Sequence, residues 1–101
     1  PVLALAERVA AGGREATELL LDAIVLFYRD AAVVAEGGPE SVVANQDLLP
    51  LLRRAAERGA SDALRRLRRA QGARRALERH AVPRLAVERF LLGCVLGEEA
   101  A

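Results

Sequence analysis

Pro83 constrains the fold of this chain more than any other residue, because it divides residues 71–96 into two helical segments. Proline has no N–H to donate and clashes with the preceding turn, so a helix that approaches it must stop. Its fixed φ angle suits the first turn of a helix, so a second helix can begin on it. The sequence therefore predicts an arginine-rich helix over 61–80, a sharp joint at 81–83 and a last helix over 83–97.

The last predicted helix is apolar on nearly every side. Its only charged residues before Gly97 are Arg84, Glu88 and Arg89. A helix with this pattern needs cover on several sides, either from its own chain or from another chain. The function depends on which of the two supplies that cover.

Three more helices are predicted upstream, over 1–11, 14–36 and 46–58, and no segment shows the alternation of a β-strand. Gly12-Gly13, Gly37-Gly38 and Gly59 supply the breaks between helices. Asn45 and Ser61 are the expected N-caps of the third and fourth helices, and Pro50 suits a first turn. The expectation is an all-α fold: a single five-helix bundle in one domain, residues 1–97, with a tail at 98–101. Because the chain begins at Pro1 without Met, we expect a fragment of a longer protein.

Residue types that carry chemistry are scarce. Zinc requires about four Cys, His or carboxylate ligands, and the chain has one His and one Cys, fourteen residues apart. Cys94 lies within an apolar run, which indicates a buried hydrophobe rather than a nucleophile. No phosphate-binding glycine motif occurs. We therefore expect no catalytic residues, no cofactor, no metal and no small-molecule substrate, and no membrane span, in a cytoplasmic protein.

The charges are unevenly distributed along the chain. Residues 1–60 contain six Arg and nine acids, a net charge of −3, whereas residues 61–101 contain nine Arg and five acids, a net charge of +4. The predicted fourth helix holds most of the excess, in Arg65, Arg66, Arg68, Arg69, Arg74, Arg75 and Arg79. Three interpretations remain open for this face: a solvated surface, an interface that pairs with carboxylates of a neighbouring subunit, or contact with DNA phosphates.

Residues 73–92, ARRALERHAVPRLAVERFLL, resemble the C-terminal signature of bacterial DNA polymerase III clamp-loader subunits, most of all the delta-prime subunit. The matching residues are Arg74 and Leu77 before the joint, and Pro83, Arg84, Leu85, Ala86, Glu88 and Leu91-Leu92 after it. Two further segments are similar to that family: Phe27-Tyr28-Arg29-Asp30 and Val43-Ala44-Asn45-Gln46-Asp47. The chain departs from the pattern at His80 and Val82, where the family has asparagines, and at Val87, where it usually has Leu. The resemblance covers most of residues 14–97.

This resemblance implies a helical collar domain that follows an AAA+ ATPase module and holds its subunit in the loader ring. The ring places the sliding clamp on primed DNA during replication, and its ATP chemistry lies in other domains. The implied partners are the other clamp-loader subunits, with DNA and the clamp bound only through the whole assembly. A gamma/tau-type collar domain, or a DNA-binding helical domain that uses the Arg65–Arg79 face, is the alternative.

The candidate site is therefore a subunit interface around the joint rather than an active site. The residues that we expect there are Arg74, Leu77, Pro83, Arg84, Leu85, Glu88, Phe90 and Leu91. The sequence does not separate those that form the core from those that contact a partner.

Overall fold

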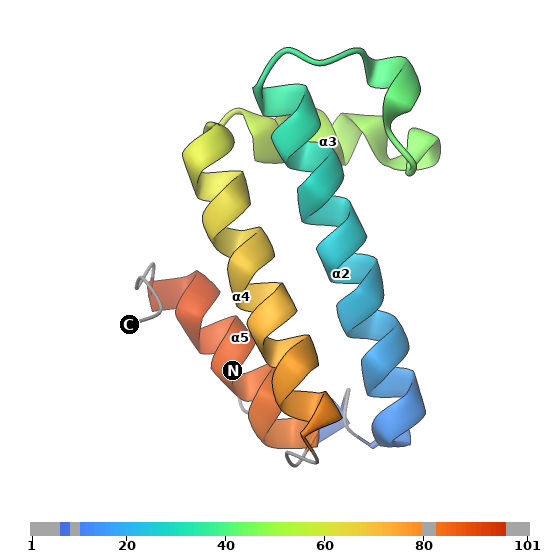
Figure 1. The fold of residues 1–101 in the computed structure, drawn as a ribbon, viewed down its shortest axis with the longest axis vertical. Helices are drawn as coiled ribbons and strands as arrows, with labels where there is room; N and C mark the ends of the chain where they lie inside the picture. Colours follow the sequence, from blue (N-terminus) through green and yellow to red (C-terminus); the bar gives the residue numbers. More distant parts are fainter. Residues whose placement is uncertain (1–6, 9–10, 80–82, 97–101) are drawn as a thin grey trace. The chain divides into compact units, whose positions relative to one another are not determined.

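The fold is all-α. A computed structural model describes residues 7–8, 11–79 and 83–96, and no β-strand occurs among them. Its α-helices, labelled in Figure 1, are α2 (Gly13–Ala35), α3 (Leu49–Ala56), α4 (Ala60–Glu78) and α5 (Pro83–Leu96). Two 3₁₀ turns, η1 (Glu40–Val42) and η2 (Gln46–Leu48), lie between α2 and α3.

The predicted number of helices was wrong. The described residues form four α-helices rather than five. Most of the predicted helix over 1–11 lies outside the described residues, of which residues 7–8 are helical. The predicted helix over 46–58 is a 3₁₀ turn followed by the shorter α3, with Pro50 in the first turn of α3 as expected.

The chain divides into two compact units. Unit 1 comprises Pro1–Asp22 and Arg69–Ala101, and unit 2 comprises Ala23–Arg68. The helices α2 and α4 each contribute one part to each unit.

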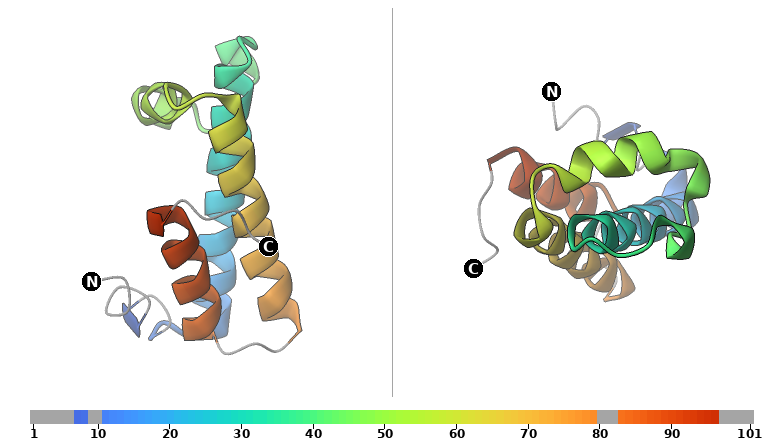
Figure 2. Two further views of the ribbon diagram at one scale, coloured as in Figure 1. Left: turned by 90° about the vertical axis from the view of Figure 1, so that its left-hand side faces the viewer. Right: turned by 90° about the horizontal axis from the view of Figure 1, so that it is seen from above.

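In unit 1, α5 lies alongside the N-terminal part of α2 and the C-terminal part of α4 (Figures 1 and 2). Leu21 of α2 and Leu77 of α4 are completely buried, and Ala86, Val87 and Phe90 of α5 are nearly so. The side chain of Arg14, near the start of α2, donates to the backbone carbonyl of Leu77. It therefore supplies a cation and donors at the C-terminal turn of α4, where unpaired carbonyls favour positive charge.

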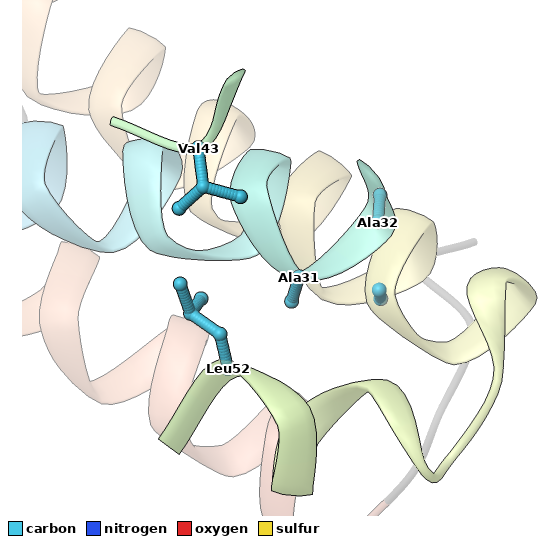
Figure 3. Close-up of a cluster of buried hydrophobic side chains, with 5 residues drawn as sticks. Ala31, Ala32, Val43 and Leu52 are labelled. Atoms are coloured by element: carbon cyan, nitrogen blue, oxygen red, sulfur yellow. The ribbon is translucent and has the colours of Figure 1, made fainter. Parts of the chain in front are cut away.

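In unit 2, the short helix α3 crosses the C-terminal part of α2 (Figure 2). Leu52 of α3 packs with Ala31 and Ala32 of α2 and with Val43 of the connecting loop (Figure 3). Ala63 of α4 completes this buried cluster. Small alanine side chains at these positions let the helix backbones approach one another closely, while Leu52 fills the remaining space.

Two glycines end α2 as the sequence predicted. The N–H of Gly38 donates to the carbonyl of Val33 at 2.9 Å, and the N–H of Gly37 donates to the carbonyl of Val34 at 3.0 Å. This is the Schellman pattern, and it requires Gly37 at a positive φ, which is +80°. A Cβ at Gly38 would lie only 2.8 Å from Cγ1 of Val33, so both positions favour glycine.

The loop after α2 is held by a buried carboxylate. Asp30 is 2% exposed. It accepts hydrogen bonds from the backbone N–H of Ala44 at 3.2 Å, from the backbone N–H of Asn45 at 3.0 Å and from Nδ2 of Asn45 at 2.8 Å. Asn45 occupies the N-cap position before Gln46 as predicted, but its side chain binds Asp30 and makes no cap hydrogen bond. The helix α4 also begins at Ala60, one residue before the predicted cap Ser61.

Candidate subunit interface

The joint between α4 and α5 differs slightly from its predicted limits. The helix α4 ends at Glu78, and α5 begins at Pro83 as expected. His80, Ala81 and Val82 lie outside the described residues. Pro83 itself is half-buried.

Two of the eight expected interface residues belong to the core. Leu77 is completely buried and Phe90 is 6% exposed. Neither side chain has surface to offer a partner, so each can affect an interface only through the fold of unit 1.

The outer surface of α5 carries an exposed stripe. Leu85 is 51% exposed and Leu92 is 40% exposed. Arg89, also exposed, lies four residues after Leu85 and three before Leu92, so all three side chains share one helical face. We call these three residues the α5 stripe. Glu88, three residues after Leu85 and four before Leu92, is half-buried beside the stripe, and Leu91 is half-buried farther round the helix.

Arg84 lies beside this stripe at the start of α5 and is exposed. Its Nη1 is 3.7 Å from Oε1 of Glu7, and both side chains are about half exposed. A pair this long and this solvated contributes little to stability, so Arg84 remains available to a partner.

Arg74 is occupied within unit 1. Its Nε donates to Oδ1 of Asp22 at 2.9 Å, and its guanidinium also lies 3.6 Å from Glu18 and 3.4 Å from Glu78. The hydrogen bond to Asp22, and then the surrounding carboxylates, raise the pKa of Arg74 above its ordinary value. Arg74 thus joins α4 to α2, and the carboxylates that it pairs with come from its own chain.

Arg69 packs against the inner side of α5 at Gly93. A Cβ at Gly93 would lie 2.8 Å from Cζ of Arg69 and nearer still to Nη1. The absence of a side chain at position 93 therefore gives the guanidinium its space. Nε and Nη2 of Arg69 are buried without a hydrogen-bond partner. Buried unpaired donors are unfavourable, so this contact costs stability in the free chain.

Two arginines in the unit 2 part of α4 are also paired internally. Asp62 accepts from Arg65, and from Nε of Arg66 at 2.9 Å. Burial lowers the pKa of Arg66, but its hydrogen bond to Tyr28 and the nearby Asp62 carboxylate outweigh that effect and raise it overall. The predicted arginine face is therefore interrupted, because Arg65, Arg66 and Arg74 all pair with carboxylates of this chain.

The expected set omitted two residues of the exposed surface, Arg89 and Leu92. Their spacing from Leu85 was visible in the sequence. This face could not be chosen from the sequence, however, since apolar residues surround the helix on all sides. The structure selects it by burying Ala86, Val87 and Phe90 on the opposite side.

Within the part of the chain that the structure describes, no three His, Cys, Asp or Glu side chains gather closely enough to hold a metal ion. None of the described helices has the length and apolarity that crossing a membrane requires. Comparison with protein family models, with curated proteins and with solved structures gave no match.

Proposed function

We propose that this chain is a non-catalytic oligomerisation domain of a cytoplasmic clamp loader, similar to the collar of the delta-prime subunit. In this role it holds its subunit in a ring of unlike subunits, and the ring places the sliding clamp on primed DNA. ATP hydrolysis and contact with the clamp belong to other parts of that assembly.

The α5 stripe is the observation that carries the proposal. Leu85 and Leu92 expose about half of their side chains seven residues apart on the last helix. Burial of a leucine side chain contributes about 1.5–3 kcal/mol, so exposed leucines on one face favour association with another surface. The stripe adjoins the joint at which the resemblance to clamp loaders is concentrated.

The Asp30 contacts support the same proposal. The segments 27–30 and 43–47 were each similar to the clamp-loader family, although twelve residues separate them in the chain. The fold joins them, because the carboxylate at the end of the first segment binds Ala44 and Asn45 of the second. Two separate sequence similarities thus correspond to one structural contact.

The internal ion pairs make DNA a weaker choice of partner. Nonspecific DNA binding depends on several free Lys or Arg side chains that reach successive phosphates. Two arginines of α4, Arg65 and Arg66, pair with Asp62 of the same helix. A third, Arg74, pairs with Asp22 of α2. An oligomeric role needs no such continuous basic face.

Assembly can be tested by size-exclusion chromatography with light scattering. The chain would be run alone and with the other clamp-loader subunits of the same organism. We expect it to elute in a defined larger complex, and Leu85→Asp to remove it from that complex while its circular dichroism is unchanged. Because Leu85 is half exposed, the substitution should leave the fold intact.

Leu51→Asp is the matched control, since Leu51 lies on α3 in unit 2 and is 52% exposed. It introduces the same charge at similar exposure, at a residue that is not part of the α5 stripe, and should leave assembly unchanged. Failure of the unmodified chain to join the complex would overturn the proposal. Binding to a DNA duplex that weakens steeply with salt would favour the alternative instead.

A further inference from the structure

A second exposed stripe lies on α2 in the same unit. Leu19 is 66% exposed, more than any other large apolar side chain that the structure describes. Glu15 lies four residues before it and Asp22 three residues after it, and both are exposed. All three therefore share one helical face, and we call them the α2 stripe.

Each stripe contains a leucine four residues from a charge of opposite sign to that on the other stripe: Leu85 with Arg89 on α5, and Leu19 with Glu15 on α2. The α5 stripe reads leucine, arginine, leucine at 85, 89 and 92, and the α2 stripe reads acid, leucine, acid at 15, 19 and 22. Their leucines are too exposed to be covering one another within a single molecule. Each stripe is thus free to meet the corresponding stripe of a second molecule.

We infer that the α5 stripe of one copy of this chain binds the α2 stripe of a second copy, with the two helices antiparallel. Leu85 and Arg89 are separated by four residues, as are Leu19 and Glu15 in the reverse direction. At about 1.5 Å per residue, both separations are roughly 6 Å along the helix. Placing Leu85 against Leu19 therefore sets Arg89 directly opposite Glu15.

The existing ion pairs select Glu15 over Asp22 as the partner of Arg89. Asp22 accepts a hydrogen bond from Arg74 at 2.9 Å. Neither Glu15 nor Arg89 takes part in an ion pair among the described residues. Contact between the copies would thus place these two charges together beside Leu85 and Leu19, without breaking any ion pair made within the described part of the chain.

The contact joins two different surfaces. Each molecule that uses its α5 stripe still has a free α2 stripe, so association can continue to further copies or close into a ring. This behaviour concerns copies of this chain alone and does not depend on the proposed place in a clamp loader.

Sedimentation equilibrium of the 101-residue chain tests the inference by charge reversal. We expect the unmodified chain to self-associate with a dissociation constant below about 1 mM. Arg89→Glu and Glu15→Arg should each weaken that association about tenfold or more, because each places like charges opposite one another. Arg75→Glu is the matched control: Arg75 is exposed on α4 outside both stripes, so its reversal should have little effect.

Mixing the two single variants gives the decisive result. The Glu15→Arg and Arg89→Glu chains, each impaired alone, should associate with each other because either stripe-to-stripe contact between the two different variants pairs opposite charges. That recovery cannot result from misfolding of either variant. A monomeric unmodified chain at 1 mM, or a mixture that associates no better than its components, would overturn the inference. Co-elution with clamp-loader subunits could still succeed in either case, so the two proposals fail separately.

Discussion

Replacing Asp30 with alanine should destabilise unit 2 more than any other single loss of a charged side chain there. The substitution removes one buried carboxylate that accepts three hydrogen bonds. It leaves the donors of Ala44 and Asn45 without their acceptor, and it releases the loop that carries Val43 into the buried cluster.

The expected loss follows from those contacts. A hydrogen bond to a charged group contributes about 1.5–3 kcal/mol, and a buried donor left unpaired costs about 1–3 kcal/mol. The three bonds share one carboxylate, and the loop donors can turn toward water afterwards, so the contributions do not add fully. We expect the free energy of unfolding to fall by about 2–4 kcal/mol, out of a typical total of about 5–15 kcal/mol.

Urea denaturation followed by circular dichroism measures this loss. A change of about 3 kcal/mol corresponds to a melting temperature lower by roughly 12–24 °C for a chain of this size. Amide hydrogen exchange gives a local reading, because the N–H groups of Ala44 and Asn45 should lose their protection in the variant. Asp47→Ala is the control, since Asp47 is exposed and the same change there should cost less than about 0.5 kcal/mol. Equal stability of the two variants would show that Asp30 does not hold the loop.

Three further predictions concern individual contacts. Gly93→Ala should lower the free energy of unfolding, measured with denaturant, by about 1–3 kcal/mol, because the Cβ of the new alanine displaces the Arg69 guanidinium. The loss should be smaller when Arg69→Ala is also present. Gly37→Ala should lower the free energy of unfolding by about 1–2 kcal/mol, because alanine is strained at a φ of +80°. A calorimetric melting temperature equal to that of the unmodified chain would contradict this reasoning. The hydrogen bond from Arg53 lowers the pKa of Glu40, so this pair stabilises the fold above the ordinary pKa of a glutamate, and the contribution is lost as the pH falls through the lowered value. Urea midpoints measured between about pH 3 and pH 6 should therefore fall less steeply with acid in Glu40→Gln.

The sequence predicted the elements that depend on local signals. The expected helices over 14–36 and 83–97 correspond closely to α2 and α5, because Gly13, Gly37 and Pro83 limit them through backbone geometry alone. The expected cap hydrogen bond of Asn45 is absent for the opposite reason. Its side chain binds Asp30, fifteen residues away, and a contact at that separation leaves no mark on the local pattern.

The candidate interface residues were harder to predict than the helices. Periodicity locates the buried face of a helix only when polar residues mark the opposite face. In α5 the apolar residues occur on every side, so the sequence could not distinguish buried Phe90 from exposed Leu85. That distinction required the positions of α2 and α4, which supply the cover for one side of α5 only (Figure 2).

The charge asymmetry between the two halves of the sequence is not present in unit 1 of the fold, which combines residues from both halves. The halves 1–60 and 61–101 differ in net charge, yet unit 1 combines two Arg and four acids from residues 1–22 with six Arg and four acids from residues 69–101. Unit 1 therefore carries no net formal charge, and Arg74 beside Asp22 shows this balance in a direct contact. A neutral unit has no strong overall field with which to attract a partner, so the proposed contact between copies relies on individual charge pairs. For the proposed contact between copies, raising the salt concentration to a few tenths molar should weaken association far less than Arg89→Glu does. A dependence on salt as steep as that of phosphate binding would place the recognition in the arginines of α4 instead.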